Sequence, residues 1–179
     1  MTDAFTPAGL LRRAAAFGVD YLVIAAYLAV VVAIGALART LAPDAARGLF
    51  GGPMPGELTG FLVVTLPVSL YFVLSERGPR SATWGKRRLG LRVMTDAGGP
   101  LTLGRSVLRT ALKFLPWELA HAVIWRLAFP GSAPPGMAEA GLVLVWLLIG
   151  ANLVAALVDA RCRTVYDRLA RTRVVRSQP

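Results

Sequence analysis

The chain has 179 residues, of which 55% are hydrophobic and 17% are charged, with 20 Lys and Arg against 10 Asp and Glu. A water-soluble domain is about 45–50% apolar and about 25% charged. The apolar residues here form long uncharged runs, which excludes an ordinary soluble domain. One cysteine and one histidine cannot build a Cys/His zinc site, a disulfide framework or a two-imidazole relay within one chain. We therefore expect no metal, no cofactor and no enzymatic activity.

Four segments have the composition of membrane spans, so we predict an all-α membrane protein with four transmembrane helices. The first contains a single charge, Asp20, and the second and fourth contain none; Pro67 is expected to kink the second. The third is amphipathic, because Lys113, Glu118 and His121 interrupt it, and it either crosses the membrane or lies at its surface. The predicted spans are residues 19–38, 58–75, 111–129 and 141–158.

The distribution of Lys and Arg predicts the orientation. Nine of them lie between Arg77 and Lys113, and six lie in the tail, residues 161–179. Short loops rich in Lys and Arg stay in the cytoplasm, so we expect the N-terminus, the middle connection and the tail to be cytoplasmic. An even number of crossings is then required, which favours a full crossing by the third segment over an interfacial helix. We predict a multi-pass protein of the cytoplasmic membrane.

The middle connection contains a predicted β-hairpin over residues 89–103. A partly alternating run ends at Thr95, two glycines follow in the turn, and Leu101 resumes the apolar pattern. Because two strands alone are marginally stable in water, we expect the β-prone run 172–175 of the tail to add a third strand. Together these segments would form a small cytoplasmic sheet.

A cluster of basic residues leads into this hairpin. We interpret it as an orientation signal, with contact to anionic lipid headgroups or a partner as the alternative, since such headgroups attract each nearby cation by about 1 kcal/mol. A phosphate-binding loop is excluded, because the required first glycine and the Ser or Thr after the lysine are missing. No aromatic platform accompanies the basic residues, so we expect no nucleic acid partner. The cluster consists of Lys86, Arg87, Arg88 and Arg92.

Arg13, Asp20 and Tyr27 repeat every seven residues and therefore share one face of the first helix. Arg13 and Asp20 are about 10 Å apart along the helix axis, so each is expected to pair with another helix rather than with the other. An ionisable residue inside a span is energetically expensive and often functional. For Asp20 we favour a structural role that ties helices together, and a role in carrying an ion or a proton is the alternative.

Asn152, Asp159 and Tyr166 form a second repeat of seven. If this face met Asp20, two carboxylates and Asn152 would form an oxygen-rich site suited to a hard cation or a proton. The simpler interpretation, which we favour, pairs Asp159 with Arg163 four residues further on.

Glu118 and His121 lie on the polar face of the third segment, together with Trp117 and Trp125. The two ionisable residues would carry protons if this face lined a water-filled cavity. We favour the alternative, an amphipathic helix whose tryptophans lie at the level of the lipid headgroups.

Four stretches carry a further pattern: Leu11–Asp20 (LRRAAAFGVD), Thr83–Val93 (TWGKRRLGLRV), Gly104–Arg109 (GRSVLR) and Tyr166–Val175 (YDRLARTRVV). In this order and with this spacing they resemble the RDD family of bacterial multi-pass membrane proteins. The resemblance covers nearly the whole chain. It implies a single membrane domain over residues 1–179.

The resemblance also implies a signature of one arginine and two aspartates. The arginine matches Arg13, with Arg12 adjacent to it, and the first aspartate matches Asp20. The closing stretch assigns the second aspartate to Asp167, whereas the spacing argument above favours Asp159. The choice between these two aspartates stays open on the sequence.

The chain departs from the family pattern at Tyr166, where members often have His, and at Arg171, where they often have Gly. Most members have no assigned function, and cation/proton antiport has been proposed for some. We favour a non-catalytic membrane module, that is, an accessory, assembly or lipid-contacting protein with an architectural Arg/Asp set. The alternative is a small antiporter of Na⁺, K⁺ or Li⁺ against protons with Asp20 as the carrier, which would need a homodimer or a larger membrane complex to enclose a cavity.

Overall fold

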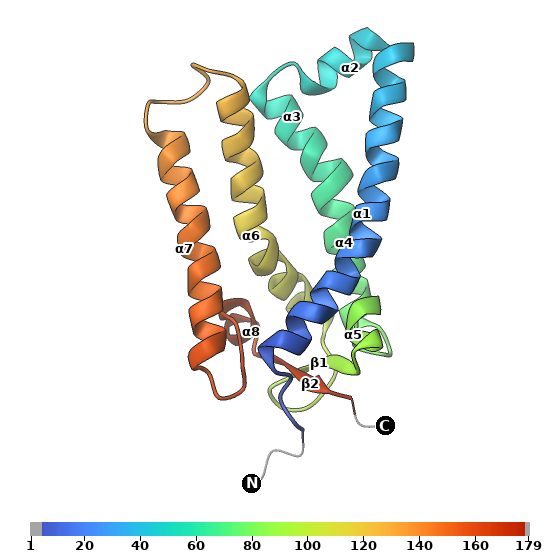
Figure 1. Ribbon diagram of the computed structural model, residues 1–179, viewed down its shortest axis with the longest axis vertical. Helices are drawn as coiled ribbons and strands as arrows, with labels where there is room; N and C mark the ends of the chain where they lie inside the picture. Colours follow the sequence, from blue (N-terminus) through green and yellow to red (C-terminus); the bar gives the residue numbers. More distant parts are fainter. Residues whose placement is uncertain (1–4, 178–179) are drawn as a thin grey trace. The chain divides into compact units, whose positions relative to one another are not determined.

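The computed structural model describes residues 5–177, and these residues are mostly helical (Figure 1). They contain eight α-helices, one π-helical segment, η1, and two β-strands. In chain order the elements are α1 (Leu10–Leu41), α2 (Pro43–Phe50), α3 (Pro53–Gly60), η1 (Phe61–Thr65), α4 (Leu66–Arg77), α5 (Trp84–Arg88), β1 (Leu91–Thr95), α6 (Leu103–Ala128), α7 (Met137–Val158), α8 (Val165–Leu169) and β2 (Thr172–Arg176).

The chain forms two compact units, each assembled from separate stretches of sequence. The first unit takes in residues 1–23, 69–113 and 150–179, and the second takes in residues 24–68 and 114–149. The first unit therefore holds both strands, α5, α8 and the beginnings of α1 and α6. Arg13, Asp20 and Asp167 all belong to it.

Three helical stretches are long and apolar enough to cross a membrane: Leu10–Leu41, Pro53–Arg77 and Met137–Val158. They correspond to the first, second and fourth predicted spans, and each begins earlier in the chain than predicted. The third predicted span lies within α6, a continuous helix of 26 residues. Because α6 carries several charged side chains, it is not among the helices apolar enough to cross a membrane. The predicted count of four spans is therefore not confirmed.

Close to Pro67, where a kink is expected, the helix contains the π-helical segment η1, which ends at Thr65, two residues before the proline. Pro67 has no N–H to donate to the carbonyl of Val63, four residues before it. The hydroxyl of Tyr27 donates a hydrogen bond to that carbonyl. A wider helical turn and a donor from α1 together keep the backbone of this apolar stretch hydrogen-bonded, as a membrane segment requires.

The sheet consists of β1 and β2 in antiparallel register, with Val93 opposite Val174. The tail strand is therefore confirmed, but the predicted hairpin is wrong. Residues 96–100 form a turn and a bend, and Leu103 already begins α6. The side chain of Thr102 accepts a hydrogen bond from the first turn of that helix (3.4 Å). A three-residue apolar alternation is too short to distinguish a strand from a helix start.

The residues just before α1 supply the third partner of the sheet. The N–H of Ala8 donates to the carbonyl of Val174, and the N–H of Arg176 donates to the carbonyl of Thr6, both at 3.0 Å. These bonds lie on the edge of β2 that β1 leaves open, and they fasten the start of α1 to the end of the chain (Figure 1).

The apolar core of the first unit joins the sheet to the start of α1. All its members are 4% exposed or less, and the small side chain of Ala16 lets the helix approach closely. This packing holds the start of α1 in place, and with it Arg13 in the first turn and Asp20 in the third. The core consists of Ala8, Ala16, Leu91, Val93, Leu101 and Val174, with Leu89 packed against it.

Aromatic packing organises the second unit. The Trp125 ring of α6 stacks on Phe50 of α2, with ring centroids 6.1 Å apart. A Cβ atom at Gly56 of α3 would lie 2.5 Å from the same ring, so only glycine fits there. Arg126 and Glu57 add an ion pair of 2.9 Å. Trp125 is thus a packing residue, bound on two sides by the helices of its own unit.

Candidate functional site: a buried ion-pair network

Asp167 is fully buried in the first turn of α8, and its own helix cap orients it. The Thr164 hydroxyl accepts a hydrogen bond from the Asp167 N–H (3.3 Å). The Asp167 carboxylate in turn accepts from the Thr164 N–H (3.2 Å) and hydroxyl (2.8 Å), which completes a capping box. Two guanidinium groups reach the same carboxylate. Arg13 Nη2 lies 2.6 Å from Oδ2, and Arg109 Nη2 lies 2.7 Å from Oδ1.

The network continues from Arg109 to a second carboxylate. Arg109 Nη1 lies 3.0 Å from Glu76 Oε2, and Lys86 Nζ lies 2.9 Å from Glu76 Oε1. Arg109 is 2% exposed and Glu76 is fully buried. Cations and carboxylates therefore alternate in space from Arg13 through Asp167, Arg109 and Glu76 to Lys86. This chain of contacts connects five helices: α1, α8, α6, α4 and α5.

The pKa of Asp167 reflects this surrounding charge. Burial by itself raises the pKa of the carboxyl group, but the guanidinium groups of Arg109 and Arg13, with hydrogen bonds from Arg13 and Thr164, lower it to about 2. The carboxylate is thus ionised at any physiological pH. It acts as a fixed negative charge between two fixed positive ones.

Asp20 forms a second buried cluster in the same unit. It is 1% exposed and accepts hydrogen bonds from the hydroxyls of Tyr71 (2.7 Å) and Thr83 (2.6 Å) and from the N–H of Gly85 (2.7 Å). A Cβ atom at position 85 would lie 2.0 Å from the Ala16 carbonyl oxygen, so glycine is needed for α5 to approach α1. As predicted, Arg13 and Asp20 each pair with another segment of the chain.

One largely buried arginine and two buried aspartates therefore lie in the same unit. The sequence model of the RDD family matches residues 7–171. The chain belongs to the RDD family. This is a family of membrane proteins, in agreement with the three apolar helices. Neither the curated proteins nor the solved structures contain a match to the chain.

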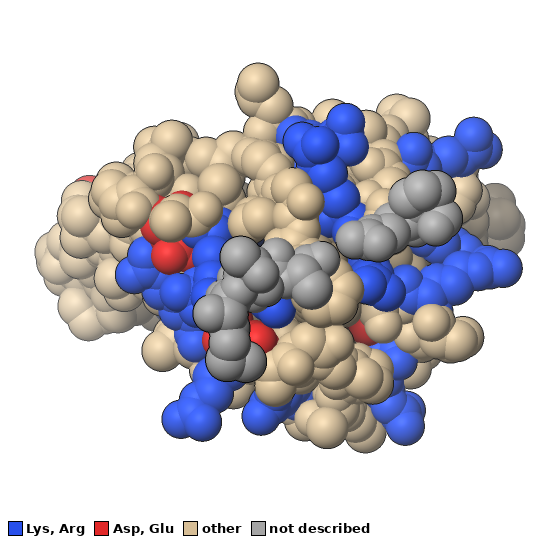
Figure 2. Space-filling model, turned by 90° about the horizontal axis from the view of Figure 1, so that it is seen from below, with Lys and Arg blue, Asp and Glu red and all other residues tan. Residues whose placement is uncertain are grey.

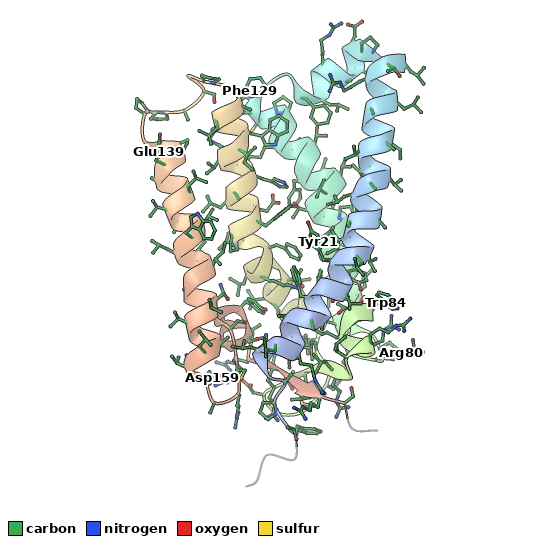
Figure 3. All side chains as sticks on the ribbon, viewed as in Figure 1. Tyr21, Arg80, Trp84, Phe129, Glu139 and Asp159 are labelled. Carbon is green, nitrogen blue, oxygen red and sulfur yellow. The ribbon has the colours of Figure 1, made fainter. Side chains whose placement is uncertain are left out.

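Within this RDD protein, the two candidates for the second aspartate have different surroundings. Asp167 binds Arg13, whereas Asp159 lies at the end of α7 (Figure 3). Asp159 Oδ2 is 2.8 Å from Arg163 Nε, and Asp159 Oδ1 is 3.7 Å from Arg168. The hydrogen bond from the Arg163 side chain lowers the pKa of Asp159. Asp159 thus forms the local pair that the simpler interpretation expects.

Of the three residues of the predicted oxygen-rich site, Asp20 and Asp159 bind different partners: Asp20 accepts from Thr83, and Asp159 accepts from Arg163. Because α7 ends just before Asp159, the repeat of seven does not continue as one helix face to Tyr166. Asn152 is half-buried on α7. Tyr166 lies in α8, where its ring stacks on Arg109 with 5.1 Å between the guanidinium carbon and the ring centroid.

Glu118 and His121 belong to the second unit and form a local pair. His121 Nδ1 lies 3.4 Å from Glu118 Oε1, and the Glu118 carboxylate also accepts a hydrogen bond from Thr65. The rings of Trp117 and His121 meet edge-on with centroids 4.8 Å apart. Glu118 thus has a hydrogen-bond donor within its own unit, whereas His121 Nδ1 makes no hydrogen bond within the described residues. The ion-pair network consists of first-unit residues alone.

The predicted basic cluster divides into two kinds of side chain. Lys86 is only 12% exposed and points inward to Glu76, which the sequence did not indicate. Arg87 and Arg88 are exposed, and Arg92 lies over the Phe5 ring at 5.2 Å. The first unit carries 17 of the 20 Lys and Arg and 6 of the 10 Asp and Glu. Figure 2 shows Lys and Arg side chains over much of one face, with few carboxylates.

Sequence reasoning missed Glu76 and Arg109, which form the centre of the network. Glu76 directly follows the uncharged second span, and no role was predicted for it from the sequence. Arg109 was grouped with the basic residues that enter the third span. A usable signal was present: Arg105, Arg109 and Lys113 recur every four residues, so they lie on one side of a helix, where a buried carboxylate would be needed to balance them.

Proposed function

We propose that this RDD protein is a non-catalytic membrane module in which the Arg/Asp set is architectural. It would act as an accessory, assembly or lipid-contacting protein rather than as an enzyme or a carrier. Four crossings, with both termini in the cytoplasm, are part of the proposal. The basic surface of the first unit would then face the anionic lipid headgroups of the inner leaflet and partner proteins beside it.

The observation that carries the proposal is that the buried carboxylates already bind protein groups, either hydrogen-bond donors or guanidinium groups. A carrier residue must exchange an ion or a proton with water, but Asp20 is 1% exposed and accepts three hydrogen bonds. Asp167 is fully buried between two guanidinium groups. Carboxylates held in this way resist the exchange of a proton or an ion with water. Through Asp20 their contacts join α1 to α4 and α5, and through Asp167 they join α1 to α6 and α8.

The proposed orientation is supported by the charge difference between the units. The first unit carries 17 Lys and Arg against 6 Asp and Glu, whereas the second carries 3 against 4. Cytoplasmic segments of membrane proteins carry the excess of Lys and Arg. A helix of 26 residues, as in α6, is about 39 Å long and can therefore cross a bilayer.

The functional test is cation-dependent proton flux in proteoliposomes, with a pH dye inside and Na⁺, K⁺ or Li⁺ added outside. We expect wild-type protein to give the same signal as empty vesicles. Asp20→Asn should lower the free energy of unfolding by about 1–3 kcal/mol, because a donor amide replaces an acceptor that three groups share. Asp44→Asn is the matched control: Asp44 is 90% exposed on α2, so its replacement should change neither signal. Wild-type flux that Asp20→Asn abolishes would contradict the proposal.

Topology can be tested by cysteine labelling. Cys162, the single native cysteine, is first replaced by serine. Ser132→Cys, between α6 and α7, should react with a membrane-impermeant thiol reagent added outside intact cells. Ser177→Cys, near the end of the chain, should react only after permeabilisation. Ala97→Cys, exposed in the connection before α6, should also react only after permeabilisation. If α6 does not cross the membrane, Ala97→Cys and Ser132→Cys will lie on the same side and react alike.

A further inference from the structure

The first unit contains a small pocket against the ion-pair network. Its volume is about 250 Å³. One wall is a face of α1, and the others come from α5, α6 and the start of α8. The lining consists of Leu10, Arg13, Ala14, Phe17, Lys86, Arg109, Lys113, Thr164 and Tyr166.

The charged side chains of this lining are all basic. It includes Arg13, Lys86, Arg109 and Lys113 and no carboxylate. The carboxylates that pair with them, Glu76 and Asp167, are fully buried and are not part of the lining. Clustered cations in a partly buried site repel one another, and an anion in the pocket would offset that repulsion.

The cations also have hydrogen-bonding capacity to offer. A guanidinium group carries five N–H donors and an ammonium group carries three. Arg13 uses one donor on Asp167 and one on the Cys162 carbonyl. Arg109 uses three, on Asp167, Glu76 and the Thr172 hydroxyl, and Lys86 uses one on Glu76. Lys113 Nζ lies 3.3 Å from the Phe72 ring centroid and 5.2 Å from that of Phe17, at the apolar side of the pocket. Phosphate oxygens accept several such charge-assisted bonds at once.

The size and the rim of the pocket indicate which kind of anion fits: a compact group attached to an apolar chain. Pockets for whole organic ligands are typically about 300–1,000 Å³, so this one suits a compact group such as phosphate. Leu10, Ala14 and Phe17 form the α1 side, and the Phe17 ring is 46% exposed. These residues belong to the same helix that continues as an apolar span. An acyl chain attached to the bound group would therefore find an apolar surface along α1.

We propose that this pocket binds one phosphate group, and that an anionic phospholipid headgroup supplies it. The inference rests on the proposed function, because it gives the lipid-contacting module a defined lipid site. Arg13 and Arg109, which hold the buried carboxylates in place, also bind the phosphate. One lipid molecule thereby becomes a structural component of the protein at the start of α1.

The test is native mass spectrometry of the intact protein, released from micelles that contain equal amounts of phosphatidylglycerol and phosphatidylcholine. We expect wild-type protein to retain one phosphatidylglycerol molecule. Lys113→Gln, which removes a pocket cation, and Ala14→Trp, which fills the pocket without a change of charge, should each weaken retention by about tenfold or more. The matched controls are Arg12→Gln and Ala15→Trp. Both positions are exposed on α1 outside the pocket, and their replacement should change retention by less than about twofold.

Inorganic phosphate distinguishes the two possible sources of the ligand. Added in millimolar excess, it should leave the retained lipid in place. Displacement of the lipid by phosphate, or phosphate retention without lipid, would overturn the assignment to a phospholipid. Equal lipid retention by wild type, Ala14→Trp and Lys113→Gln would overturn the site itself. The flux measurement is independent of this count, since Asp20-dependent flux would overturn the proposed function whatever the lipid result.

Discussion

Arg13 and Asp167 are 154 positions apart in the chain and form a salt bridge of 2.6 Å between Nη2 and Oδ2. The Arg13 side chain is 11% exposed and that of Asp167 is fully buried. Arg13 also donates a hydrogen bond to the carbonyl of Cys162, in the turn that leads to α8. One arginine in the first turn of the first helix thus holds both the carboxylate of Asp167 and the backbone at Cys162.

Replacement of Asp167 by alanine should be severely destabilising. The variant leaves Arg13 and Arg109 buried without their shared carboxylate, and removal of one partner from a buried ion pair costs about 3–5 kcal/mol. Chemical unfolding in detergent measures the effect. Asp159→Ala is the control, since its partly exposed pair with Arg163 is worth less than about 1 kcal/mol. Similar losses in both variants would show that the network is not a major source of stability.

A charge swap should fail to restore the lost stability. In the double variant Arg13→Asp/Asp167→Arg, the new arginine at position 167 would face Arg109, which is 2.7 Å from the native carboxylate. We therefore expect the double variant to be at least as unstable as Asp167→Ala. Recovery to near wild-type stability in the same unfolding assay would indicate that Arg109 is not coupled to the pair.

The stability of the protein should fall in strong acid because of Asp167. A carboxyl group whose pKa is lower in the folded state, about 2 against 3.8 unfolded, contributes stability above pH 4, and this contribution disappears as the pH falls towards 2. The shift corresponds to about 2 kcal/mol. Melting temperatures of wild type and Asp167→Asn between pH 7 and pH 2 test this. The gap between the two proteins should narrow below pH 4, and a constant gap would argue against the predicted ionisation.

Gly85→Ala should disrupt the contact between α5 and α1. Its Cβ atom would lie 2.0 Å from the Ala16 carbonyl oxygen and 2.9 Å from the Asp20 backbone nitrogen, so a helix must move. We expect a loss of at least about 2 kcal/mol in the free energy of unfolding. Gly18→Ala, on α1, meets no atom within 4 Å, and alanine there should be neutral or stabilising by up to about 1 kcal/mol. The reverse ranking would rule out close helix approach as the reason for Gly85.

Arg171→Gly should stabilise the protein. Arg171 has φ of 53°, in the left-handed region that is unfavourable for residues with a Cβ atom by about 1–2 kcal/mol. Glycine offsets part of this gain through its freer unfolded state, so we expect a net gain of about 0.5–1 kcal/mol. This conformation also explains why glycine suits this position of the family pattern. The expected rise in melting temperature is about 2–4 °C, and Arg168→Gly, within α8, should lower it.

The apolar runs, the excess of basic charge and the tail strand could be predicted because each depends on a short stretch of sequence. The seven-residue spacing of Arg13 and Asp20 correctly placed both on the face of α1 that contacts other segments. The prediction of a hairpin was wrong at Leu101–Leu103, because an alternation of only three residues cannot distinguish a strand from the start of a helix. Periodicity also misled at Tyr166, because nothing in the spacing marks the end of α7 at Val158.

The sequence by itself determined that this is a multi-helix membrane protein of the RDD family with a strongly basic portion. It also singled out Arg13 and Asp20, and it left Asp167 and Asp159 as the two candidates for the second aspartate of the signature. Only the tertiary structure decided that Asp167 rather than Asp159 meets Arg13, that Glu76 and Arg109 complete the network, and that Lys86 points inward. Composition and helical period depend on neighbouring residues along the chain, and the sequence therefore displays them. The pairing of buried charges depends on which helices pack together, and that packing joins residues more than a hundred positions apart.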